Sequence, residues 1–114
     1  MKDRLADMKN ELRARDLISQ DLLAWGTRTV ASMFAQGMAF FGIKDGKLMV
    51  LPFLDLDTVL FKDAKYYTKE SIKDIRFSGL ASLLQITTND GTVAKYRIEK
   101  GKPDMKLIVS AFSD

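Results

Sequence analysis

The chain contains neither cysteine nor histidine, and these two absences exclude whole classes of function. Without cysteine no disulfide can form, so the fold must rest on its hydrophobic core. Zinc sites of the Cys/His type are excluded, and so are Ser-His-Asp and Cys-His catalytic groups, because the imidazole base is missing. Acid–base chemistry near neutral pH would need a carboxylate or lysine with a strongly shifted pKa. The composition therefore predicts a protein that is not an enzyme and binds no cofactor.

Long apolar runs and proline are also scarce. No stretch of 18 consecutive apolar residues occurs, so no transmembrane helix is expected. The 114 residues include two prolines and no low-complexity segment that would mark a linker, so we expect a single domain over residues 1–114. The first residues alternate in charge and lack the apolar region of a secretory signal, which predicts a cytoplasmic protein.

Positive charge is in modest excess. The net charge is +3, and residues 60–114 carry all of it, with ten basic and seven acidic side chains. Lys95 and Arg97 alternate along one predicted strand face, and Lys65 and Lys73 would extend that basic surface. Such a surface would attract an anionic lipid or a phosphate ligand weakly. The alternative is a solvated sheet face, on which lysines discourage aggregation.

The clearest structural signal lies between Leu83 and Ile98. Two alternating apolar runs flank Asn89-Asp90-Gly91, a sequence typical of a β-hairpin turn. The apolar face of this hairpin would carry Leu84, Ile86, Tyr96 and Ile98. We expect that face to pack beneath a C-terminal helix over residues 103–113, in which Pro103 would be the first residue.

Residues 2–20 predict an N-terminal helix. Leu5, Met8 and Leu12 share one face at helical spacing, but the pattern is too short for a coiled coil. The helix therefore either packs on its own domain or contributes to a dimer interface.

Residues 22–43 fit two readings. Their apolar residues follow the spacing of an amphipathic helix, and they also fit a strand–turn–strand arrangement. We favour strands near residues 23–32 and 37–43, because Gly37 and Gly42 would each weaken a helix by about 1 kcal/mol.

Further strands are predicted along the rest of the chain. The turn at Asp45-Gly46 joins the preceding strand to another over residues 48–53. Short strands are expected over residues 65–68 and near the end of 71–77. The element order predicts a mainly β, α+β domain.

Two small groups of side chains offer weaker functional signals. Asp55 and Asp57 alternate and would reach a divalent ion together, although a loop is the better interpretation, and we expect no metal site. Tyr66, Tyr67 and Tyr96 lie near lysines and would stack on bases, but tyrosines in strands usually pack, and no nucleic-acid-binding motif is present. Nucleic acid is therefore not an expected partner.

The element order resembles the pleckstrin-homology-like domains, specifically the small bacterial ones. The hairpin Gly42-Ile43-Lys44-Asp45-Gly46-Lys47-Leu48 is similar to the early turn of that family. The segment Ser71-Ile72-Lys73-Asp74-Ile75-Arg76-Phe77 is similar to the start of its second sheet, and the Asn89-Asp90-Gly91 hairpin and the helix over 103–112 resemble its last two strands and capping helix. The resemblance covers residues 22–114. It implies a barrel or two packed antiparallel sheets of six to seven strands over residues 22–101 and a C-terminal capping helix. The predicted N-terminal helix over residues 1–20 lies outside this common core and would be an addition to it.

This resemblance also implies a function. The family consists mainly of binding and scaffolding modules, so we expect a non-catalytic interaction module whose partner is another protein or a second copy of itself. Members that bind phosphoinositides cluster basic residues around the first hairpin, where this chain offers only Arg28, Lys44 and Lys47. Specific phosphoinositide binding is therefore not expected, and weak contact with an anionic membrane surface remains the alternative.

Overall fold

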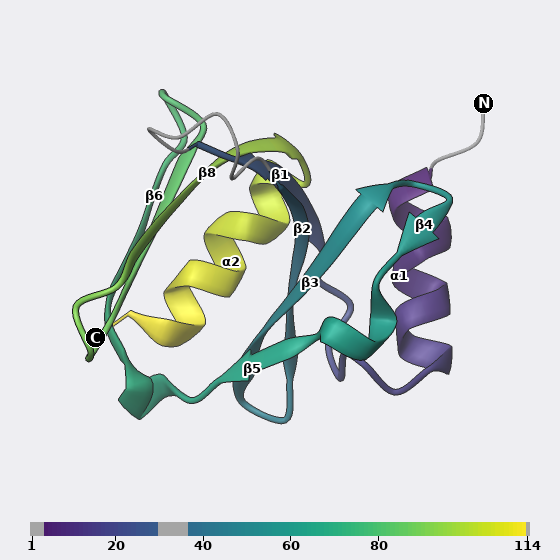
Figure 1. Ribbon diagram of the computed structural model, residues 1–114, viewed down its shortest axis with the longest axis horizontal. Coiled ribbons are helices and arrows are strands. Elements are labelled where there is room, and N and C mark those ends of the chain that lie inside the picture. The colour runs from purple at the N-terminus through teal and green to yellow at the C-terminus, as the bar shows by residue number, and fades with distance from the viewer. Residues whose placement is uncertain (1–3, 30–36, 114) are drawn as a thin grey trace.

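The computed structural model describes residues 4–29 and 37–113 and shows a mainly β, α+β fold (Figure 1). The elements are α1 (Arg4–Ala14), β1 (Ala24–Arg28), β2 (Met38–Lys44), β3 (Lys47–Asp55), β4 (Thr58–Val59), the 3-10 turn η1 (Phe61–Asp63), β5 (Lys65–Tyr67), the 3-10 turn η2 (Lys69–Ser71), β6 (Ile72–Ser78), β7 (Leu83–Thr88), β8 (Val93–Lys100) and α2 (Lys102–Phe112). No helix in these two ranges is long and apolar enough to cross a membrane.

The strands form one antiparallel sheet in the order β4-β3-β2-β1-β8-β7-β6. The strand β5 also pairs with β3, along residues 48–50, whereas β4 pairs with the end of β3 at Phe53 and Asp55. The described residues therefore hold eight strands rather than the six or seven expected, because two short strands share one edge of β3. The predicted fold class is confirmed.

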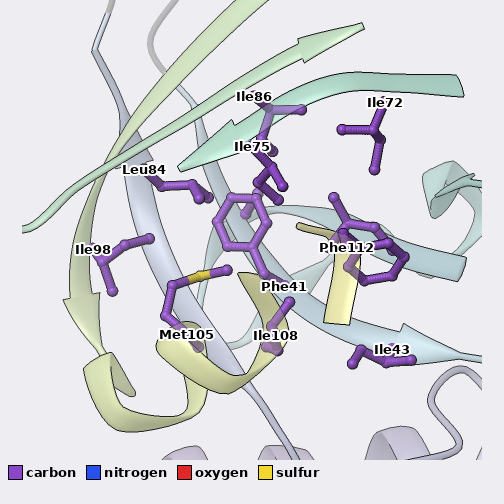
Figure 2. Packing of buried hydrophobic residues seen from close by; sticks show 13 residues of the cluster. Phe41, Ile43, Ile72, Ile75, Leu84, Ile86, Ile98, Met105, Ile108 and Phe112 are labelled. Carbon is purple, nitrogen blue, oxygen red and sulfur yellow. The ribbon is translucent and has the colours of Figure 1, made fainter. Parts of the chain in front are cut away.

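The sheet bends around α2 and carries α1 on its outer face. Figure 1 shows α2 between the β6–β8 side of the sheet and β2, while α1 stands on the far side of β3. Each helix covers its own hydrophobic cluster. The inner cluster lies against α2 and includes Phe41, Met105 and Ile108. The outer cluster lies against α1 and includes Leu12, Phe40 and Phe53. The inner cluster centres on Phe41, which Figure 2 shows between Leu84, Met105 and Ile108. The predicted apolar face of the hairpin lies in this cluster, with Ile86 and Ile98 buried and Tyr96 packed against it.

The outer cluster explains why the sequence of residues 22–43 fits both a helix and a pair of strands. In β2 the side chain of Phe41 faces α2, and that of its neighbour Phe40 is buried beneath α1 with Leu12 and Phe53. A strand covered on both faces loses the alternation of apolar and polar residues that identifies strands. The preference for a strand over residues 37–43 is confirmed, and the strand expected near residues 23–32 is present as β1, although residues 30–36 lie outside the described part of the chain.

The predicted end of the first helix, near residue 20, is wrong by about six residues. The helix α1 ends at Ala14, and Asp16 then adopts a left-handed conformation with φ of 60°. The backbone N–H of Leu17 donates to the carbonyl of Leu12 at 2.9 Å, and that of Asp16 to Arg13 at 3.1 Å. These two bonds are the helix-ending pattern that usually contains glycine. Because Asp16 occupies the position where glycine is usual, the sequence does not indicate that the helix ends there.

The carboxylate of Asp104 connects the two helices. It lies in the first turn of α2, where negative charge is favourable. One of its oxygens accepts a hydrogen bond from the backbone N–H of Leu23 at 3.1 Å and pairs with Lys9 of α1 at 3.2 Å. This contact helps to fix α1, the start of β1 and α2 relative to one another.

The turn between β7 and β8 contains a structural carboxylate. The side-chain hydroxyl of Thr88 donates to Asp90, whose Oδ1 also accepts from the backbone N–H of Thr92 at 2.9 Å. The hydrogen bond from Thr88, followed by those from Thr92, lowers the pKa of Asp90 below its ordinary value of 3.8. A carboxyl group whose pKa is lower in the folded state stabilises that state at pH values above 3.8 and loses this effect as pH falls through the native pKa.

We therefore expect Asp90→Asn to lower the melting temperature near neutral pH but not in strong acid. The amide keeps an oxygen that accepts the same hydrogen bonds, so the substitution removes mainly the charge. Melting curves of both proteins should differ at about pH 7 and converge at about pH 2. A difference of the same size at both pH values would contradict this role of the charge.

Candidate anion-binding pocket

A cavity of about 420 Å³ opens on the inner face of the sheet, where β1, β2, β3, β5 and β8 come together. Small side chains create the space, because Ala39 and Ala94 line it where larger residues would fill it. Among the described residues, the lining is formed by Arg28, Gly37, Met38, Ala39, Val50, Pro52, Lys65, Tyr67, Thr92, Ala94 and Tyr96. No carboxylate is among these residues, so within the described structure the lining carries only positive formal charge.

Arg28 is the most unusual residue of this pocket. It ends β1 and lies opposite Tyr96 of β8 in the antiparallel register. Its backbone N–H donates to the carbonyl of Gly37 at 2.6 Å, which anchors the main chain. Its side-chain Nε is buried, yet it has no hydrogen-bond partner within residues 4–29 and 37–113. Buried donors are nearly always paired, so this nitrogen requires an explanation.

Tyr96 supplies a hydroxyl group next to this guanidinium. Its ring contacts Phe41 edge-on, with the ring centroids 4.8 Å apart, and this contact fixes its position in the inner cluster. Burial raises the pKa of Tyr96 above its ordinary value of 10.0, and the charge of Arg28 offsets part of that increase. The hydroxyl therefore keeps its proton at neutral pH and is able to donate a hydrogen bond into the cavity.

The strand β5 delivers a second cation and a second hydroxyl. Alternation along the strand places Lys65 and Tyr67 on its inner face and Tyr66 on its outer face. Tyr66 points the other way, because its hydroxyl donates a hydrogen bond of 3.5 Å to the carbonyl of Leu17, in the segment that joins α1 to β1. Lys65 and Tyr67 both line the cavity. Of the four predicted basic residues, Lys65 is the one that reaches this site.

The other three predicted residues lie elsewhere. Lys95 and Arg97 share the outer face of β8, as their alternation predicts, and both are exposed. The Nε of Arg97 donates to a carboxylate oxygen of Glu99 at 2.7 Å, which offsets its charge. Lys73 lies at a bulge in β6, the last strand of the sheet order. The structure therefore does not gather the four residues into one basic surface.

Sequence reasoning did not select Arg28, although a signal for it exists. In β1 the residues Ala24 and Gly26 alternate with Trp25 and Thr27, and Arg28 continues the row of the two small residues. Ala24 belongs to the inner cluster. An arginine that continues a small, buried row is expected to face inward, and this pattern could have identified Arg28 as a candidate pocket residue.

Asp55 and Asp57 have a structural role at the β3–β4 turn. The backbone N–H of Asp57 donates to a side-chain oxygen of Asp55 at 2.8 Å, which closes the turn. Asp57 also lies 3.7 Å from Arg4 of α1. Asp55 is the last residue of β3 and Asp57 lies in the turn that follows, so the loop interpretation holds for Asp57. No cluster of three potential metal ligands occurs among the described residues.

Comparison with known proteins adds one structural neighbour. Neither a family model nor a curated protein sequence matches the chain. The fold is similar to the crystal structure of the C-terminal domain of an unknown protein from Leishmania infantum. The two chains share 11% sequence identity with a TM-score of 0.62, and the match covers 93% of this chain and 94% of the neighbour. At this level of identity the similarity shows a shared fold and nothing more.

Proposed function

We propose that the chain is a non-catalytic, pleckstrin-homology-like binding module that holds a small anionic group in the inner pocket. The observation that carries this proposal is the buried Nε of Arg28, which has no partner among the described residues and borders a cavity of about 420 Å³. A phosphate or carboxylate oxygen would satisfy that donor and offset its charge.

The surrounding side chains suit the same ligand class. A guanidinium presents its donors in a planar fork that matches the oxygens of phosphate and carboxylate, and Lys65 adds a second positive charge. The hydroxyls of Tyr67 and Tyr96 add neutral donors, and Val50 and Pro52 supply apolar walls. An apolar cavity with a few convergent polar groups is the usual form of a ligand site.

Membrane contact through the outer face of β8 has less support. Its two cations are Lys95 and Arg97, and Arg97 is already paired with Glu99. Lys73, which was expected to extend this surface, belongs to the edge strand β6. A lipid would therefore be recognised by its phosphate in the pocket rather than by a basic sheet face.

The test is a titration with inorganic phosphate and pyrophosphate, followed by isothermal calorimetry and by the amide signals of Ala39 and Ala94. We expect binding that Arg28→Gln weakens by about 10- to 100-fold, because one charge-assisted hydrogen bond contributes about 1.5–3 kcal/mol. Arg97→Gln is the matched control, since it removes the same charge from the outer face and should leave the affinity unchanged. Equal effects of the two substitutions, or signal changes confined to the outer face, would contradict the proposal.

A second arm identifies the source of the anion. Phosphatidylcholine vesicles with and without phosphatidylserine are sedimented with the wild-type protein and with Arg28→Gln. Binding that needs phosphatidylserine and is lost in the variant indicates a lipid headgroup. Binding to free phosphate without vesicle binding indicates a soluble ligand.

A further inference from the structure

The strand β6 leaves one edge of the sheet open. It pairs with β7 on one side and is the last strand in the sheet order, so no described strand occupies its other edge. An unpaired edge presents backbone N–H and C=O groups that can pair with another chain. A bulge interrupts β6 at Lys73, and the register with β7 is regular from Asp74 to Ser78. The regular part of the edge is therefore the part available for pairing.

The charges of β6 alternate in sign along this open stretch. Asp74 and Arg76 lie on the outer face of the sheet, and the arginine Nε donates to the carboxylate at 2.7 Å. Ile75, between them, is buried on the inner face, and Phe77 packs against the same inner cluster. The stretch Asp74-Ile75-Arg76 thus carries opposite charges symmetrically placed about one apolar residue.

This arrangement is complementary to a second copy of itself. Two β6 strands related by a two-fold axis pair in antiparallel fashion. Residues directly opposite each other point to the same face of the sheet, so the inner face of one copy continues the inner face of the other only if one residue lies opposite the same residue of the second copy. That residue marks the position of the axis. An axis at Ile75 places Asp74 opposite the Arg76 of the second copy, twice by symmetry. An axis at Asp74 or at Arg76 places like charges opposite each other, and an axis at Phe77 leaves both charges without an opposite charge.

We propose that two copies of this chain pair through the open edge of β6, with the two-fold axis at Ile75. Opposite charges directly across an antiparallel pair are stabilising, and like charges are destabilising. One short strand from each copy is a small contact compared with that of a stable dimer, so the expected dimer is weak and forms only at high protein concentration. Because the attraction is between exposed charges, added salt weakens it.

Charge reversal tests the pairing and its register together. Asp74→Arg and Arg76→Asp each place like charges opposite one another, and each should raise the dimer dissociation constant about tenfold or more in sedimentation equilibrium of the full chain. An equimolar mixture of the two variants restores opposite charges across the pair and should form the heterodimer. The double variant with both reversals should dimerise as the wild type does.

Lys95→Glu is the control, because it changes the net charge as much as Arg76→Asp does but lies on β8, away from the edge. It should dimerise like the wild type. A wild-type protein that stays monomeric at high concentration and low salt would overturn the proposal, and so would single reversals without effect or a mixture that does not associate. Circular dichroism of each variant establishes that it is folded. The pocket and the edge have different residues, so the phosphate titration and this test fail or succeed independently.

Discussion

Replacing Gly101 by alanine is expected to lower the free energy of unfolding by about 2–5 kcal/mol, which combines left-handed backbone strain with overpacking. Gly101 joins β8 to α2 with a φ of 83°, and its carbonyl accepts the first hydrogen bond of the helix from Met105 at 2.8 Å. A Cβ at this position would lie 2.5 Å from the carbonyl oxygen of Leu23 and 2.8 Å from the Cα of Ala24. Both neighbours are backbone atoms, so neither can move without disturbing the start of β1.

Gly91→Ala provides the matched control. Gly91 has a similar φ of 88°, but a Cβ there would meet no atom within 4 Å among the described residues. Its cost should be limited to the left-handed conformation, about 1–2 kcal/mol. Urea unfolding of both variants separates the two effects. If both lose the same stability, the close approach of Gly101 to β1 is not important for the fold.

The regular part of the fold could be predicted from local sequence because its signals are local. The hairpin from β7 to β8 has one solvent-exposed face and one buried face, so apolar and polar residues alternate along its strands. The sequence Asn89-Asp90-Gly91 indicates the turn between them. In β2 the alternation disappears because α1 and α2 cover opposite faces. That coverage depends on tertiary packing, which no short window of sequence contains.

The candidate site was less predictable for a related reason. Its cations, Arg28 and Lys65, are 37 positions apart in the sequence and are brought to one cavity only when β1 and β5 take their places in the sheet. Counting basic residues favoured Lys95 and Arg97, which are close in sequence and share an outer face. Arg28 is instead distinguished by its buried, unpartnered Nε, a property that only the folded chain has.

Leu12→Ala is expected to destabilise the protein by about 2–5 kcal/mol, the range for a leucine removed from a packed core. Leu12 is completely buried on α1 and belongs to the outer cluster, with Leu23 and Phe40 among its members. It also forms the helix-ending hydrogen bond with Leu17, another member packed against that cluster. The helix therefore contributes to the stability of its own domain, which is the first of the two roles that the sequence left open.

The concentration dependence of this effect separates the two roles of α1. If Leu12 packs within one chain, the difference in unfolding free energy between wild type and variant is the same at low and high protein concentration; an intermolecular role would make that difference grow with concentration. Leu107→Ala on α2 is the control, because Leu107 is 57% exposed and should lose less than about 0.5 kcal/mol. Since the proposed dimer edge lies on β6, weak association there affects wild type and variant alike and cancels in the difference. A difference that rises with concentration would assign α1 to an interface and would require a second contact between copies besides the β6 edge.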